Sequence, residues 1–89
     1  MATELLATGD DVASSADLVV AEDTTVTVAL KGVNGKAPKV LVELKDDAGE
    51  YNQVDMIDMS RGDPAIIVIT APGTYRFSRR EGTCGVFHA

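Results

Sequence analysis

The sequence predicts an all-β fold, a small antiparallel β-sandwich of jelly-roll-like type with an N-terminal arm. Short segments of alternating apolar and polar residues are separated by turn residues at nearly even spacing, which is typical of strands that bury one face. With 89 residues, 45% of them hydrophobic and 25% charged, the chain has the size and composition of one globular domain. The predicted strands are 25–31, 39–45, 51–57, 64–70, 74–79 and 84–88.

The N-terminal residues differ from the rest, and we predict that residues 1–16 form an arm or a first edge strand. Leu5 and Leu6 give this segment a short apolar run, which small polar residues follow. Chain ends that are not tied down are usually mobile, so the segment would be ordered by docking on the domain or on a neighbouring chain. Residues 17–89 are predicted to form a single β-sandwich domain.

The first two regular strands each have a clear core face. A glycine-containing stretch, 32–36, separates them; it lacks the spacing of a phosphate-binding loop, and we predict a hairpin loop that residues 37–38 extend. Residues 46–49 combine Asp with Gly and predict a hairpin turn after the second strand. The residues that alternation places in the core are Val26, Val28 and Leu30 in the first strand and Val40, Val42 and Leu44 in the second.

The C-terminal part shows the same alternation. Pro72 and Gly73 mark a tight turn, after which Tyr75 and Phe77 are expected to face inward. Gly82 marks a last turn before the strand at 84–88.

The strand at 64–70 departs from the alternating pattern, because its residues 65–69 are all apolar. A continuous apolar run indicates burial on both faces. It is either a central strand that a loop or the N-terminal segment covers, or a strand that lies against another chain. Partner contacts are therefore predicted at Ile66, Ile67, Val68 and Ile69, together with Leu5 and Leu6.

Charge is unevenly distributed along the chain. The net charge is −6, and residues 1–30 hold six acidic residues and no basic one. Arg76, Arg79 and Arg80 crowd near the C-terminus; we predict a charged rim for partner contact, with solvated surface charges as the alternative. Because affinity for nucleic acids comes mainly from Lys and Arg, the acidic balance argues against a nucleic-acid partner.

Membrane, disulfide and metal chemistry lack support in the sequence. No apolar run approaches the ~18 residues of a membrane span, and the N-terminus has no signal-peptide features, so we expect a soluble protein made in the cytoplasm. Cys84 is the only cysteine, so no internal disulfide is expected. Paired acids at 10–11, 22–23 and 46–47, and the pair of Asp55 and Asp58, supply oxygen ligands but do not fit a calcium loop. We expect no cofactor. The alternative is an ion on the symmetry axis of an oligomer, for which each chain would need to supply only one or two ligands.

Two short motifs have plainer structural explanations than functional ones. Cys84 and His88 could be a nucleophile and its base, but on a strand their Cα atoms lie about 13 Å apart, too far for a hydrogen bond. The chain is therefore not expected to be an enzyme. The tripeptide from Arg61 to Asp63 spells the integrin-binding sequence, yet Gly and Asp before Pro64 are also what a turn into a strand requires.

Several segments resemble small β-rich proteins of tailed bacteriophages. These are Met-Ala-Thr-Glu-Leu-Leu-Ala-Thr-Gly at 1–9, Thr-Thr-Val-Thr-Val-Ala-Leu-Lys-Gly at 24–32, Pro-Ala-Ile-Ile-Val-Ile-Thr-Ala-Pro-Gly-Thr-Tyr-Arg-Phe at 64–77 and Gly-Thr-Cys-Gly-Val-Phe at 82–87. Some such proteins are capsid decoration, or cement, proteins.

The resemblance implies a non-enzymatic virion protein on the capsid surface. Its partners would be the major capsid protein and further copies of this chain. The alternatives are a tail or head-fibre component, and a surface-binding adhesion module.

Overall fold

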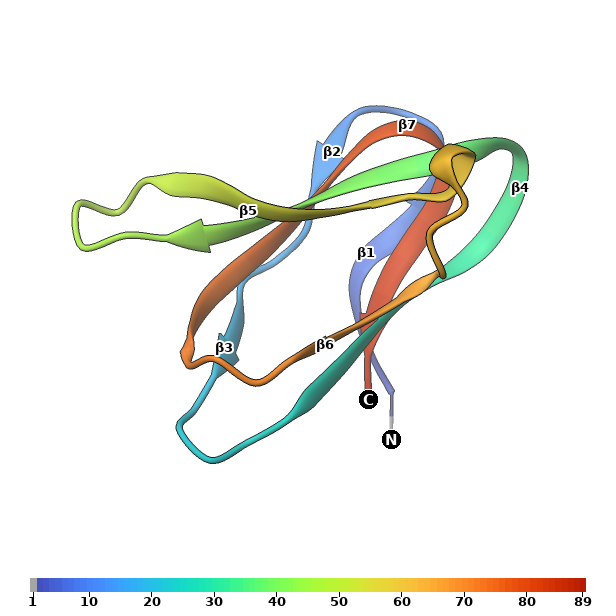
Figure 1. Ribbon diagram of the computed structural model, residues 1–89. Helices are drawn as coiled ribbons and strands as arrows, with labels where there is room; N and C mark the ends of the chain where they lie inside the picture. The colour runs from blue at the N-terminus through green and yellow to red at the C-terminus, as the bar shows by residue number, and fades with distance from the viewer. Residues whose placement is uncertain (1) are drawn as a thin grey trace.

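The computed structural model describes residues 2–89, and these form an all-β fold with a single turn of 3-10 helix (Figure 1). All strand pairs are antiparallel, so the prediction of an all-β antiparallel fold is confirmed. The elements are β1 (Thr3–Gly9), β2 (Ala13–Ser14), β3 (Leu18–Val20), β4 (Val26–Lys45), β5 (Tyr51–Asp58), the 3-10 turn (Met59–Arg61), β6 (Ile66–Ile69) and β7 (Gly73–His88).

The sheet is built around its two longest strands, β4 and β7, which pair with each other. On the far side of β4, β5 pairs with its C-terminal half and β6 with its N-terminal half. On the far side of β7, β1 pairs with its C-terminal half, and β2 and β3 with its N-terminal half. The central pair is therefore flanked by two half-sheets, one of β5 and β6 beside β4 and one of β1, β2 and β3 beside β7 (Figure 1). Both half-sheets pack on one core. The jelly-roll-like connectivity is a finer statement than this architecture and stays a prediction.

The predicted boundaries inside β4 and β7 were wrong. Residues 26–31 and 39–45 belong to one strand, and so do 74–79 and 84–88, while Thr25 lies just before its strand. The cause is the glycines at the predicted turns: Gly32, Gly35 and Gly82 have φ values of 62°, 66° and 75°. Positive φ allows β-bulges, which bend a strand without reversing it. The predicted hairpin loop at 32–36 is such a bend, and the pairing of β4 with β7 shifts register there.

The core lies inside this bent sheet and draws on both half-sheets. Tyr75 and Phe77 face inward as predicted, and Phe77 is completely buried. Val26 and Leu44 are only partly buried because they lie towards the ends of β4. The buried core consists of Leu18, Val20, Val28, Leu30, Val40, Val42, Ile57, Ile69, Tyr75, Phe77, Cys84 and Val86.

The turn between β4 and β5 has the predicted hairpin chemistry. The Asp46 carboxylate accepts hydrogen bonds from the backbone N–H groups of Ala48 and Glu50, both at 2.9 Å. Gly49 has a φ of 82°, which a residue with a side chain rarely adopts. The turn therefore fixes the register with which β5 returns along β4.

The N-terminal segment lies in the sheet. β1 runs along β7 from the Thr3–His88 pair to the Gly9–Cys84 pair, as an edge strand. The backbone N–H of Ala16 donates to the Leu5 carbonyl at 3.1 Å, which ties the end of this segment to its beginning. No structural break separates residues 2–16 from the following strands, and β1 does not cover the outer face of β6, because Ile66 and Val68 are exposed there.

Candidate functional site

The most exposed apolar element of regular structure is β6. It pairs with β4 alone, through the Ile66–Ala29 to Ile69–Val26 pairs, so it is an edge strand. The expectation of a central strand under a loop or the N-terminal segment is therefore wrong. Ile66 is 48% and Val68 55% exposed, whereas Ile67 is half-buried and Ile69 lies in the core. The strand alternates after all, but its outer positions are apolar.

A groove of about 230 Å³ lies between β6 and β5. It exists because β5 and β6 pair with different halves of β4 and do not pair with each other, which leaves the sheet open between them (Figure 1). The groove reaches the core at Val42 and Tyr75, whose hydroxyl donates to the Ala71 carbonyl at 2.9 Å. Its lining residues are Val42, Val54, Asp55, Ile67, Val68, Ile69, Thr70, Ala71 and Tyr75.

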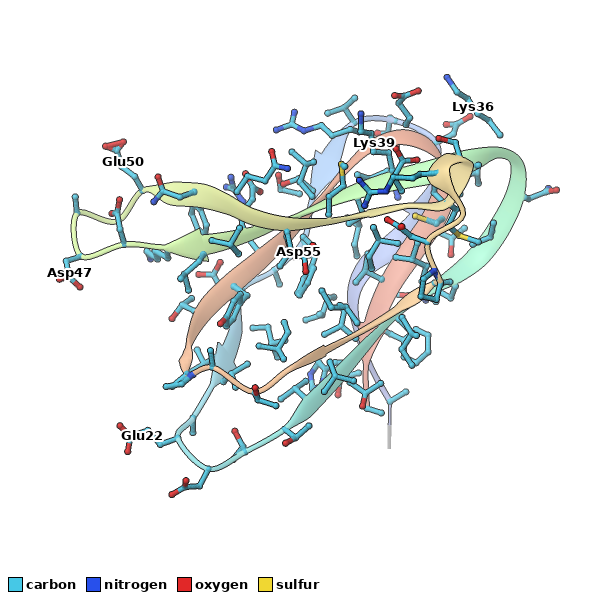
Figure 2. All side chains as sticks on the ribbon, viewed as in Figure 1. Glu22, Lys36, Lys39, Asp47, Glu50 and Asp55 are labelled. Carbon is cyan, nitrogen blue, oxygen red and sulfur yellow. The ribbon has the colours of Figure 1, made fainter. Side chains whose placement is uncertain are left out.

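Asp55 is the only ionisable carboxylate or amine in this lining. Asp55 on β5 pairs with Val42 on β4, and Val42 faces the core. Because paired residues direct their side chains to the same face, the Asp55 side chain leaves the backbone on the inner face of the sheet. Figure 2 shows Asp55 on the side of β5 that faces β6. Within residues 2–89 no ion pair involves Asp55. Its carboxylate accepts a hydrogen bond from the backbone N–H of Met56 at 2.7 Å, and the guanidinium of Arg61 is hydrogen-bonded to Asp63 instead.

Leu5 and Leu6 are placed away from this groove. Both are half-buried and pack against the core from β1. Two strands of the sheet separate β1 from β6. The predicted apolar contacts therefore do not form one surface.

The three clustered arginines have three different environments. Arg76 spans the outer face of the sheet, where its guanidinium donates to the Glu43 carboxylate at 3.1 and 3.4 Å and lies 3.7 Å from the centre of the Tyr51 ring. Ser78 also donates to Glu43. Burial alone would raise the pKa of Glu43, but the hydrogen bonds from Arg76 and Ser78 outweigh it and hold that pKa below its ordinary value.

Arg79 is buried, with 3% of its side chain exposed. Its guanidinium donates to three backbone carbonyls, those of Asp11 at 2.7 Å, Ala7 at 3.0 Å and Cys84 at 2.6 Å. Arg80 alone is exposed, beside Lys36 and Glu81. The predicted charged rim is therefore wrong for Arg79, which holds the turn after β1, and the three arginines do not form one rim.

Cys84 and His88 both lie on β7, as the strand prediction requires. Cys84 is fully buried, and burial raises the pKa of its thiol despite the nearby Arg79. A buried thiol with a raised pKa is a poor nucleophile. Among residues 2–89 no group of three or more His, Cys, Asp or Glu side chains is arranged to hold a metal ion. The described chain also contains no helix with the length and apolarity that crossing a membrane requires.

The tripeptide from Arg61 to Asp63 forms a closed turn. Arg61 donates to the Asp63 carboxylate at 2.5 and 3.2 Å, and Gly62 has a φ of 97°. The Asp63 carboxylate also accepts from the backbone N–H of Asp58 at 2.9 Å. The two charged ends are bound to each other, which supports the interpretation as a turn.

Two features described above were not predicted from the sequence, the burial of Glu43 and the lining of the groove by β5. Alternation placed Glu43 on the outer face but gave no sign of its burial under Arg76. Asp55 was considered only as an oxygen ligand together with Asp58, and Val54 was not singled out, because the proximity of both residues to β6 depends on the bend in β4. Comparison with known proteins finds no match: no protein-family model, no curated protein and no solved structure is significantly similar to this chain.

Proposed function

We propose that this chain is a non-enzymatic structural protein of a bacteriophage particle, which decorates the capsid shell and binds it through β6. The observation that carries the proposal is the apolar, exposed face of an edge strand. The resemblance of several sequence segments to small bacteriophage proteins suggests the phage particle as the setting. The groove beside β6 offers a surface for contact.

An edge strand with an exposed apolar face is unusual in a monomeric protein. Soluble proteins protect free edges with charges, prolines or bulges, because unpaired backbone groups bind other strands. Ile66–Ile69 contains none of these devices, although Pro64 and Pro72 limit its length. Strand addition at such an edge gives affinity through backbone hydrogen bonds and specificity through side chains.

Binding of this kind would reinforce a shell. A protein that binds only the assembled state shifts the assembly equilibrium towards it by mass action. A small domain without a catalytic set is sufficient for this function, because the stabilisation comes from many identical contacts.

Addition of the purified protein to expanded capsids that lack it tests the proposal. We expect saturable, stoichiometric binding and a higher temperature of capsid rupture. Replacing Ile66 and Val68 with Thr should weaken binding about tenfold or more, because apolar surface is no longer buried at the contact. Replacing Val12 and Val19 with Thr is the matched control, since both are exposed outside β6. Absence of binding to expanded capsids, with binding to tails instead, would contradict the proposal.

A further inference from the structure

We infer that the groove between β5 and β6 receives an extended segment of a different protein chain, which pairs with the free edge of β6 and places a Lys or Arg side chain against Asp55. The identification of that chain as a shell protein rests on the proposed function; the chemistry of the segment rests on the structure.

The free edge of β6 determines the conformation of the segment. In an antiparallel pair, alternate residues direct their backbone groups to the partner strand and the others direct them away. β6 uses the first set for β4, so its second set faces the open side towards β5. An extended chain is the ligand that satisfies a row of such groups.

The size and lining of the groove determine which side chain it takes. Pockets for drug-sized molecules have volumes of about 300 to 1,000 Å³, and this groove, at about 230 Å³, is smaller. Apart from Asp55, the lining residues that β5 and β6 contribute are Val54, Ile67, Val68 and Ile69. Lys and Arg have an apolar stem and a charged head, so either fits an apolar groove with one carboxylate.

The charge around the groove also favours a basic segment. Asp55 makes no ion pair within the described residues. At the other end of β6, Glu22 and Asp23 line a second hollow with Thr70 and Pro72, and Figure 2 shows Glu22 projecting from the turn before β4. Complementary charge speeds encounter and selects the partner.

A second copy of this chain does not supply the required cation. The strands that pair on one side only are β1, β2, β3, β5 and β6, and none of them contains Lys or Arg. Pairing β6 with β6 of another copy would also leave Asp55 without a partner, since residues 62–75 contain no basic residue. The segment therefore comes from a different chain.

Blocked nine-residue peptides of alternating Thr and Val, with Lys, Glu or norleucine at the centre, test this inference. Binding is followed through the amide signals of the isotope-labelled protein. We expect the Lys peptide to shift the amides of residues 66–69 and to bind about tenfold more tightly than the Glu peptide, a difference of about 1.4 kcal/mol. The norleucine peptide, which has a stem without a charge, should lie between them.

Asp55→Asn should remove most of the preference for Lys over Glu, and Asp55→Lys should reverse it. Asp47→Asn is the matched control, because Asp47 is an exposed acid at the tip of the β4–β5 turn (Figure 2). Edge strands also use inward-pointing charges to prevent self-association. If Asp55→Asn associates with itself while peptide preference is unchanged, Asp55 has that protective function and the inference is wrong.

Absence of peptide binding at millimolar concentration, or shifts outside the β5–β6 groove, would also overturn it. These outcomes are separable from failure of the proposed function. Wild-type protein that binds capsids but shows no Lys preference would refute the inference alone. A Lys-selective groove in a protein that ignores capsids would refute the capsid function alone.

Discussion

The guanidinium of Arg79 holds Asp11 by two hydrogen bonds, one to its backbone carbonyl at 2.7 Å and one to its carboxylate at 3.0 Å. The two ends of this pair differ in environment, since the Arg79 side chain is 3% exposed and that of Asp11 82%. The carboxylate of the ion pair is therefore open to solvent, whereas the guanidinium is not, and the backbone bonds and the ion pair can be separated by mutation.

Replacing Arg79 with Lys should lower the free energy of unfolding by about 2 to 4 kcal/mol, because one ammonium nitrogen cannot reach all three carbonyls that the guanidinium binds. Asp11→Ala should cost less than about 1 kcal/mol, since an exposed ion pair contributes little. Arg80→Lys is the control at an exposed position. Denaturant unfolding measures all three, and equal losses for Arg79→Lys and Asp11→Ala would show that the ion pair is the important contact.

Glu43 should make stability depend on pH. Its pKa in the folded protein is lowered, so its contribution is present above the ordinary value of 4.5 and is lost as the pH falls through the folded value. Glu43→Gln should cost about 1 to 3 kcal/mol at pH 7, as charge-assisted hydrogen bonds are lost. Unfolding curves between pH 7 and acid should show this difference shrinking below pH 4.5; a constant difference would contradict it.

Gly82 and Gly35 form a matched pair for testing the bends. Both have positive φ, but a Cβ on Gly82 would lie 2.6 Å from the Lys36 carbonyl oxygen, whereas Gly35 has open space. Gly35→Ala should cost only the strain of positive φ, about 1 to 2 kcal/mol. Gly82→Ala should cost at least about 1 kcal/mol more, because backbone must move. Thermal unfolding distinguishes the two variants.

The Cys84 thiol should be protected in the folded state. It is buried and its pKa is raised, so the reactive thiolate is scarce. A disulfide reagent should label it slowly in buffer and rapidly in denaturant. Fast labelling of the native protein would show that β1 opens readily from β7, because Gly9 of β1 pairs with Cys84.

The sequence was sufficient for the fold class and for most of the core. Alternation at Val40, Val42, Tyr75 and Phe77 predicted faces that the structure confirms, because one face of each strand is dry. It was insufficient at Gly32 and elsewhere in the bends, since glycine with positive φ serves equally in a turn that reverses a strand and in a bulge that bends it.

The candidate site was only half predictable. Ile66 and Val68 were visible as part of an apolar run, but composition alone cannot distinguish an exposed edge from a covered centre. The place of Asp55 in the groove was not predictable, because it depends on the proximity of β5 and β6, which do not pair with each other. Arginine is usually a surface residue, so the sequence does not indicate that Arg79 is buried. It is accommodated in the interior because backbone carbonyls of β1 and of the turn after it accept hydrogen bonds from its guanidinium.

The dependence of every strand on β4 and β7 has a consequence for how the protein folds. β5 and β6 pair with β4, and β1, β2 and β3 pair with β7, so the sheet is incomplete until those two strands meet. Their contacts join positions as far apart as Val28 and His88. Domains dominated by such distant pairings refold slowly, in milliseconds to seconds. During synthesis, β1 to β3 have no strand to pair with until residues 73–88 have been made.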